Sequence, residues 1–299
     1  MISVEQLDRA AAELRLSDRP VIVHASLRSF GEPIQGGADA LLDLLLARGC
    51  TVLVPAFTEP QFGVAPPVDM RPARNGIDYS ALTGGTATQD GRIYGVDCRD
   101  INPGLGTLPA MLIDRDDAVR GDHPLNSFAA VGPEAEGLVA AQSPADVYGP
   151  IRELADRDGA ILLIGVGLDR MTALHLAEQR SGRRLFVRWA RNAGGEVSMV
   201  EIGSCSEGFP HLEPTLDPLA RTATVGASAW RSYPADEALA AATAAIAARQ
   251  SITHCGDPGC LLCRDATAGG PVGLAPPRTG GVDAVGPSAA GGAPTVGAR

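Results

Sequence analysis

The segment from Ala160 to Arg180, AILLIGVGLDRMTALHLAEQR, constrains the fold more than any other part of the chain. It opens with an unbroken apolar run that ends at Val166. A run of this length predicts a strand that is buried on both faces. Gly165 and Gly167 then allow the backbone to turn at the end of that strand. The pattern predicts a buried strand, a glycine turn and a helix.

The helix expected after this turn carries a histidine and a carboxylate on one face. Asp169 and Thr172 are good caps for its start. His175 and Glu178 stand at positions i and i+3, so their side chains lie about one turn apart. Such a pair at the mouth of an α/β sheet is a usual way to hold a general base. The spacing alone is equally compatible with a solvated helix face.

The chain before this segment has the order of a parallel unit. Pro20–Ala25 and Thr51–Phe57 read as strands, and Ala38–Ala47 between them has helical periodicity. A strand, loop, helix and strand in this order predict a parallel sheet with a right-handed crossover. The polar, glycine-rich loop of residues 26–37 should therefore lie at the carboxyl edge of the sheet, where α/β folds bind ligands.

Further elements follow from periodicity and turn signals. The stretch from Glu59 to Asp100 has little periodicity, which is typical of a functional lid or a variable insertion. The expected elements are helices at 108–115, 134–142 and 235–249 and strands at 127–131, 183–190 and 196–202. His123, in a turn, is interpreted as a structural histidine.

Charge and hydropathy exclude several classes of protein. The formal net charge of −10, with every basic residue an arginine, argues against a nucleic-acid partner. It favours a cationic ligand, or serves solubility alone. No apolar run approaches the ~20 residues that a membrane span needs. The first twenty residues mix acids and bases without an apolar core, so we expect no signal peptide and a cytoplasmic protein.

Five motifs together resemble the aminoglycoside 3-N-acetyltransferase family in order and spacing. The match runs from about Val21 to Arg249, and five ordered motifs are far more specific than any one of them. The motifs are VHASLRSFG, INPGLGTLP, HPLNSFAAVGP, GVGLDRMTALHLAE and GSCSEGFPHLEP.

This resemblance implies a fold, an activity and a set of residues. The fold is α/β, a three-layer α/β/α arrangement around a central, largely parallel sheet. The activity is direct transfer of an acetyl group from acetyl-coenzyme A to the 3-amino group of a deoxystreptamine aminoglycoside, which confers antibiotic resistance. His175 corresponds to the catalytic histidine, with Glu178 as its support. The residues implied on the coenzyme A side are Ser26, Leu27, Arg28, Ser29, Phe30 and Gly31.

The chemistry of acetyl transfer fits a histidine base. An ammonium group has no lone pair, so a base must accept its proton before or during attack on the thioester. An imidazole with an unperturbed pKa near ~6.5 can do this at neutral pH, and a carboxylate would orient it. Acidic and polar side chains should hold the cationic amine. The candidates are Asp169, Thr172, Glu207 and Glu213.

Three other functions stay open. Leu168 and Met171 stand where the family commonly has polar residues, which favours the same fold acting on another amine of secondary metabolism. A hydrolase would use water in place of the amine. A non-catalytic, metal-stabilised binding module would depend on the cysteines instead. The oligomeric state is also open, with a homodimer as one option.

A cluster of cysteines precedes a tail of biased composition. His254, Cys255, Cys260 and Cys263 lie within ten residues, and the Cys260-x2-Cys263 pair has the spacing of a zinc half-site. Cys205 is a candidate fourth ligand from elsewhere in the chain. Reduced thiols and a redox disulfide are the alternatives. We expect an acetyltransferase domain at 1–265, with the cluster at its end, and a disordered Gly/Pro/Ala-rich tail at 266–299.

Overall fold

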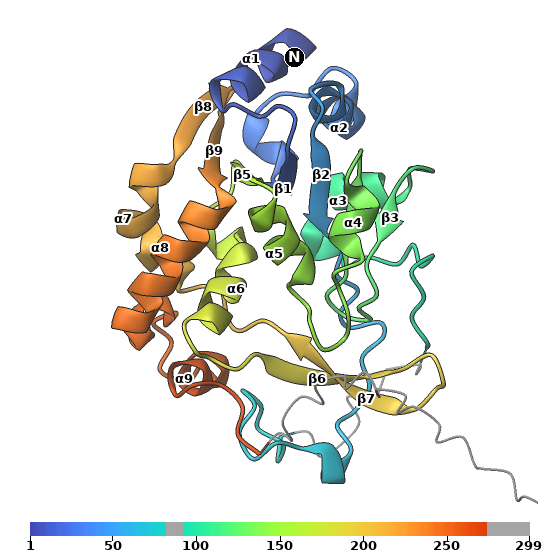
Figure 1. Ribbon diagram of the computed structural model, residues 1–299, viewed down its shortest axis with the longest axis vertical. Coiled ribbons are helices and arrows are strands. Elements are labelled where there is room, and N and C mark those ends of the chain that lie inside the picture. The colour runs from blue at the N-terminus through green and yellow to red at the C-terminus, as the bar shows by residue number, and fades with distance from the viewer. Residues whose placement is uncertain (82–91, 274–299) are drawn as a thin grey trace, which may run out of the picture.

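The computed structural model describes residues 1–81 and 92–273, in which a seven-stranded sheet forms the centre of the fold (Figure 1). The strand order is β3-β4-β2-β1-β5-β9-β8. Three strands at the centre run parallel: β2 (Thr51–Pro55), β1 (Pro20–Ala25) and β5 (Ala160–Ile164). Their carboxyl ends therefore meet at one edge of the sheet, as predicted.

The outer strands pair antiparallel with their neighbours on both sides of this parallel centre. On the β2 side these strands are β4 (Phe128–Val131) and β3 (Val119–Arg120), and on the β5 side β9 (Ser228–Pro234) and β8 (Arg221–Val225). The β8–β9 hairpin was not predicted, because its alternating residues follow a segment without clear periodicity.

Helices cover both faces of the sheet and complete the predicted three-layer α/β/α fold. Alternate residues of β5 show the two layers, since Ile161 and Leu163 belong to one buried cluster and Leu162 and Ile164 to the other. One face is covered by α1 (Val4–Glu13), α2 (Gly37–Ala47) and α3 (Thr107–Ile113). The other is covered by α4 (Ala135–Val139), α5 (Gly149–Asp156), α6 (Ala173–Arg180) and α8 (Ala235–Ala248).

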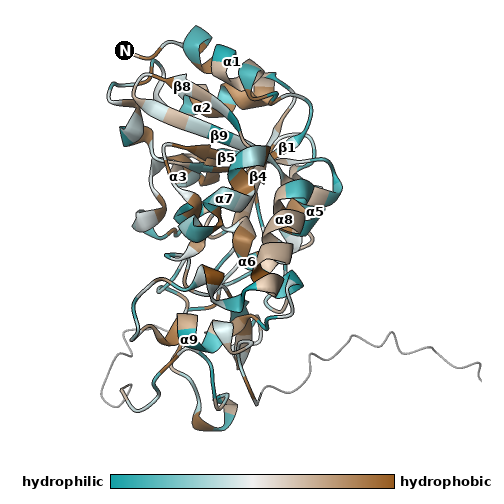
Figure 2. Cartoon of the chain, turned by 90° about the vertical axis from the view of Figure 1, so that its left-hand side faces the viewer, coloured by the Kyte–Doolittle hydropathy of each residue, from teal (hydrophilic) through white to brown (hydrophobic). Residues whose placement is uncertain are grey.

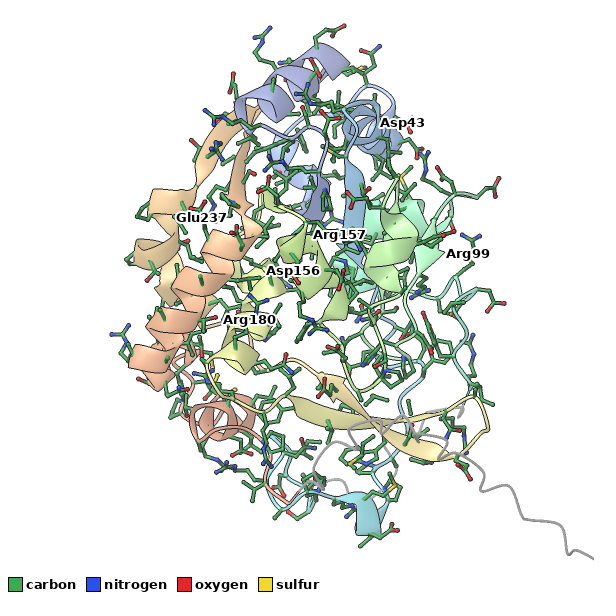
Figure 3. All side chains as sticks on the ribbon, viewed as in Figure 1. Asp43, Arg99, Asp156, Arg157, Arg180 and Glu237 are labelled. Atoms are coloured by element: carbon green, nitrogen blue, oxygen red, sulfur yellow. The ribbon has the colours of Figure 1, made fainter. Side chains whose placement is uncertain are left out.

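Many charged side chains of the flanking helices lie on the surface of the molecule. Strands β4 and β5 are brown in Figure 2, whereas the ribbon of α1 carries both teal and brown segments. Helix α1 begins with a capping box between Ser3 and Gln6 and buries Leu7. Charged residues such as Asp156, Arg180 and Glu237 are exposed on the helices (Figure 3). The structure thus follows the amphipathic pattern of the sequence.

A second unit packs below the sheet, near the bottom of Figure 1. It contains the hairpin of β6 (Phe186–Arg191) and β7 (Val197–Ile202) and the short helix α9 (Leu261–Thr267). The irregular segment that begins at Glu59 packs on this unit. Asn75 exchanges hydrogen bonds with both backbone groups of Val187, at 2.9 and 3.0 Å. A short helix, α7 (Glu213–Leu216), lies beside α8.

The expected domain boundary after residue 265 falls inside α9. Ala266 is buried in the core beneath the hairpin, and Val272 donates a backbone hydrogen bond to Arg74. The packed structure therefore extends beyond the expected start of the tail, at least to residue 273. Residues 274–299 of that tail, and residues 82–91 of the irregular segment, lie outside the described residues. Within the described ranges, no helix has the length and hydropathy to cross a membrane.

Candidate active site

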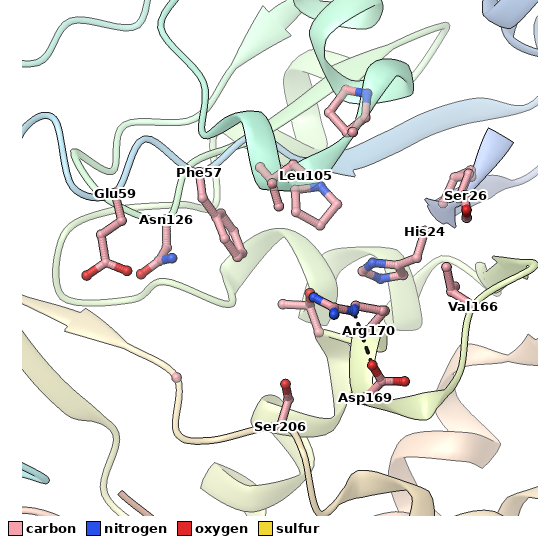
Figure 4. A pocket seen from close by; sticks show the side chains of 18 of the residues that line it. His24, Ser26, Phe57, Glu59, Leu105, Asn126, Val166, Asp169, Arg170 and Ser206 are labelled. Carbon is pink, nitrogen blue, oxygen red and sulfur yellow. Dashed lines mark ion pairs between the residues drawn. The ribbon is translucent and has the colours of Figure 1, made fainter. Parts of the chain in front are cut away.

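A pocket of about 930 Å³ opens at the carboxyl ends of the parallel strands (Figure 4). Residues that follow β1, β2 and β5 line it, together with residues from the start of α6 and the loop after β7. In Figure 4, Glu59 and Asn126 lie toward one end, and His24 and Ser26 toward the other. The pocket is in the size range of a small-molecule site.

His175 lies in the wall of this pocket and is bonded to Glu178. Its Nδ1 atom is 2.9 Å from Glu178 Oε2. Ser204 Oγ also approaches Nδ1, at 3.4 Å, but it donates to the same Glu178 oxygen at 2.6 Å. The shorter contact with the carboxylate indicates that Nδ1 carries the proton. The lone pair is then on Nε2, which makes no hydrogen bond to the described residues.

The second oxygen of Glu178 is held by an arginine. Arg183 Nη1 donates to Glu178 Oε1 at 2.5 Å, and Thr253 Oγ1 lies 3.3 Å from the same atom. Burial raises the pKa of Glu178, but the hydrogen bond with His175 and the charge of Arg183 outweigh it and lower the pKa overall. Glu178 is therefore a buried carboxylate that is ionised at neutral pH, and its hydrogen bond fixes the ring of His175.

Aromatic rings and a glycine fix the plane of the imidazole. Tyr148 stacks on His175 with 5.9 Å between ring centroids, and Phe209 lies on it at 4.8 Å. A Cβ atom on Gly203 would lie 2.8 Å from His175 Cδ2, so only glycine fits there. The ring is therefore held from two sides and has one orientation.

The six residues expected on the coenzyme A side divide into two groups. Ser26, Leu27 and Arg28 line the pocket. The other three residues support this turn instead. Ser29 Oγ forms hydrogen bonds with the carbonyl oxygen of Ser26 and with Ser228 Oγ. The ring of Phe30 packs against Trp230 and is 1% exposed. Gly31 has a φ of +74°, which favours glycine. The ring of Phe30 belongs to the core and does not line the pocket.

The four residues expected around the amine also divide. Asp169 and Thr172 line the pocket, and Asp169 forms an ion pair with Arg170 at 3.1 Å (Figure 4). Glu207 is exposed and does not line it. Glu213 lies 3.6 Å from Arg231 and is likewise outside the pocket wall. Another carboxylate, Glu59, lines the pocket, although sequence analysis did not name it as a site residue.

The two apolar residues that depart from the family pattern lie in the core. Leu168 is 0% exposed and Met171 is 1% exposed, and both pack in the cluster beneath α6. Neither side chain is part of the pocket wall. Their apolar character therefore supports the packing of the turn, and it gives no information about the substrate.

Sequence analysis did not name several of the residues that line the pocket. Arg188 comes from β6, and Tyr148 precedes α5. His24, at the end of β1, was read only as part of a strand, yet its buried Nε2 has no hydrogen-bond partner in the described chain. Its place in VHAS, directly before a polar loop at the carboxyl edge, was the available signal.

His24 provides a test through the pH dependence of stability. Burial lowers its pKa to about 3. The unfolded chain binds this proton below pH ~6.5, so stability is full above that pH and falls as the pH drops toward 3. Between pH 7.5 and pH 5 the free energy of unfolding of the wild type should fall. In His24→Gln this fall should be smaller by about 2 kcal/mol, measured by urea unfolding at both pH values. The exposed His211→Gln should follow the wild type. An unchanged slope in His24→Gln would contradict the neutral, buried state of His24.

His123 is structural, as interpreted from the sequence. Its Nε2 is 2.8 Å from Glu201 O, and its Nδ1 accepts from the backbone N–H of Asn126 at 2.9 Å. Burial lowers the pKa of His123 to about 4, against the smaller opposing effect of that carbonyl. The ring therefore joins two backbone segments and does not enter the pocket wall.

Comparison with known proteins identifies the family. The family model described as aminoglycoside 3-N-acetyltransferase matches residues 22–247. The chain belongs to this family. Aminoglycoside N(3)-acetyltransferase IX of Micromonospora chalcea is 33% identical over 175 residues, 56% of this chain and 58% of that protein. Aminoglycoside N(3)-acetyltransferase VIII of Streptomyces fradiae is 30% identical, over 54% of each chain. The matched part thus spans little more than half the length of these relatives.

Solved structures of acetyltransferases have the same fold. The apoenzyme of aminoglycoside acetyltransferase AAC(3)-IVa gives a TM-score of 0.68 at 23% identity, over 90% of this chain and 97% of that chain. A mutant of that enzyme in complex with a gentamicin gives a TM-score of 0.69 at 22% identity, with the same coverage. At this identity the likeness shows the α/β fold of the family and leaves the substrate to be argued from the site.

Proposed function

We propose that this acetyltransferase-family protein transfers the acetyl group of acetyl-coenzyme A to the 3-amino group of a deoxystreptamine aminoglycoside. The observation that carries this proposal is His175 in the pocket wall, bonded through Nδ1 to the buried Glu178, with Nε2 free to act as a base. The family membership supports the reaction class. The orientation of the His175 ring supports proton transfer from the substrate amine to Nε2.

The roles of the residues follow from the geometry. As the amine nitrogen attacks the thioester carbonyl carbon, Nε2 of His175 accepts a proton from that nitrogen. The carboxylate of Glu178 lowers the cost of the resulting imidazolium, and Arg183 keeps that carboxylate ionised. The acetyl group then goes directly from sulfur to nitrogen, and coenzyme A leaves. No acyl-enzyme is required.

The acyl donor fits one end of the pocket. Acetyl-coenzyme A supplies the activated thioester when bound. Ser26, Leu27 and Arg28 line that end, and the orphaned Nε2 of buried His24 offers a polar partner. The guanidinium of Arg28 is suited to the phosphates of such a ligand. These contacts support the coenzyme A side implied by the VHASLRSFG motif.

The carboxylates at the pocket suit a cationic substrate. Glu59 and Asp169 line the wall and can accept hydrogen bonds from ammonium groups. Three guanidiniums, on Arg28, Arg170 and Arg188, line the same pocket. This balance of charge favours a second candidate, the same acyl transfer to a less cationic amine.

Release of free coenzyme A from acetyl-coenzyme A, separated by chromatography, tests these functions together. Gentamicin and other deoxystreptamine aminoglycosides should stimulate release, while simple primary amines should have little effect. Stimulation only by simple amines would favour the second candidate. Release at a rate that no amine changes would show a thioester hydrolase and contradict the proposal.

A further inference from the structure

Four cysteines that are far apart in sequence converge below the active site. Cys205 follows β7, whereas Cys255, Cys260 and Cys263 belong to the C-terminal segment that leads into α9. Their sulfur atoms all lie within 4.8 Å of one another. A tetrahedral zinc site with Zn–S bonds of about 2.3 Å has sulfur atoms about 3.8 Å apart, so the observed cluster needs only a small contraction.

The backbone supports this convergence. The N–H of Cys255 points at the sulfur of Cys263 at 3.3 Å, and the N–H of Cys263 at the sulfur of Cys260 at 3.5 Å. Such donors stabilise negative charge on sulfur. His254, expected as a ligand, is not part of the cluster, because its Nδ1 accepts from the N–H of Gly256 at 3.2 Å.

The two segments that carry the cysteines also touch each other directly. A Cβ atom on Gly208 would lie 2.1 Å from the carbonyl oxygen of Thr253, so their backbones are in contact. His211 Nδ1 lies 3.1 Å from the carbonyl oxygen of Ile252. The cluster thus lies at a junction between the loop after β7 and the C-terminal segment.

This junction holds two of the groups that bind Glu178. Ser204, which bonds to Glu178 Oε2, is the residue before Cys205. Thr253, which contacts Glu178 Oε1 and accepts from Arg183, is two residues before Cys255. A displacement of the cysteines would therefore move hydrogen-bond partners on both sides of the carboxylate that orients His175.

We propose that Cys205, Cys255, Cys260 and Cys263 bind one structural Zn²⁺ and that this ion fixes Ser204 and Thr253 against Glu178. Four thiolates in a tetrahedral arrangement select zinc or an iron centre over the hard cations that prefer oxygen. Because all four positions are filled by protein, the ion has no open site for a water or a substrate. It acts on catalysis only by positioning Glu178, and this part rests on the proposed function.

Metal analysis of the untagged, full-length protein tests the site. After dialysis against metal-free buffer, we expect about one zinc ion per chain. Under denaturing conditions with a chelator, all six cysteines should react as thiols. Less than about a tenth of a zinc ion per chain, or two reactive thiols in place of six because the cluster has formed two disulfides, would overturn the proposal.

A pair of variants makes the assignment specific. Cys260→Ser should lose the zinc, whereas Cys98→Ser should keep it, because Cys98 lies outside the cluster beside Asp100. If Cys260→Ser does not fold, the alternative experiment is to replace zinc by cobalt in the wild-type protein and to record its absorption spectrum. The expected result is the absorption of a tetrahedral Co²⁺ centre bound by thiolates. Zinc retained by Cys260→Ser, or cobalt without this spectrum, would contradict the ligand set.

The claim that the zinc ion positions Glu178 is tested separately, by steady-state kinetics. Zinc removal should lower kcat for acetyl transfer while leaving the KM for acetyl-coenzyme A within about twofold, and zinc should restore kcat. An unchanged kcat in zinc-free, folded protein would refute the positioning part and keep the metal site. If no form of the protein transfers acetyl groups, the proposed function fails, and the zinc stoichiometry still decides whether the site exists.

Discussion

We expect His175→Ala to lower kcat for the proposed acetyl transfer by a factor on the order of 10²–10⁴, the usual contribution of a general base. The variant removes Nε2, the ring nitrogen that makes no hydrogen bond to any described residue. It also leaves a gap between Tyr148 and Phe209, so its stability should fall as well. Steady-state kinetics with saturating acetyl-coenzyme A measure the effect on kcat.

His175→Asn separates the loss of the base from the loss of packing. The asparagine amide can still donate to Glu178 from near the position of Nδ1, but it has no counterpart of Nε2. We expect the same fall in kcat with a smaller loss of thermal stability. If His175→Asn kept more than about a third of the wild-type kcat, where a general base contributes at least about 10², His175 would not be the base.

Arg183→Met should be the most destabilising single change near the site. The guanidinium is buried and donates to Glu178, Gln250 and Thr253. Its removal leaves the carboxylate of Glu178, which is 2% exposed, without its cationic partner. Removing one partner of a buried ion pair costs about 3–5 kcal/mol. Urea unfolding at pH 7 measures this loss in the free energy of unfolding.

Arg157→Met is the matched control for this prediction. Arg157 lies 3.1 Å from both Glu134 and Glu153, but these groups are partly exposed to solvent. An ion pair of that kind contributes about 1 kcal/mol or less. The double variant Glu178→Gln with Arg183→Met should lose less than the sum of the single losses. Equal losses in Arg157→Met and Arg183→Met would contradict the account of Glu178 as a buried, paired carboxylate.

The parts of the site that sequence analysis predicted are those encoded locally. The strand at Ala160–Ile164 is a continuous apolar run, and the pair of His175 and Glu178 follows from helical spacing. Both depend on residues a few positions apart. The central strands and most of the helices were predicted for the same reason.

The parts that were missed depend on contacts between distant segments. Besides His175 and the nearby Arg183, the partners of Glu178 are Ser204 and Thr253, which periodicity cannot bring to it. Glu59 enters the pocket from the irregular segment, where no repeating pattern indicates a direction for a side chain. Phe30 is the opposite case: its motif predicts a ligand contact, whereas its ring packs against Trp230 in the core.

The cysteine cluster lies between these two cases. The spacing of Cys260 and Cys263 indicated a half-site, and chemistry alone named Cys205 as a candidate fourth ligand. Only the packing of the loop at Gly208 on Thr253 brings Cys205 to the others. His254 lies outside the cluster, and its Nδ1 accepts a hydrogen bond from the N–H of Gly256 in a local turn.

The position of the acetyl group on the product tests the central claim most directly. A deoxystreptamine aminoglycoside is incubated with acetyl-coenzyme A and the protein, and the purified product is examined by two-dimensional NMR. The account predicts a single acetyl group on the 3-amino nitrogen, formed at least about a hundredfold more slowly when His175→Asn is used. An acetyl group on another nitrogen, or free acetate with unmodified aminoglycoside, would contradict it.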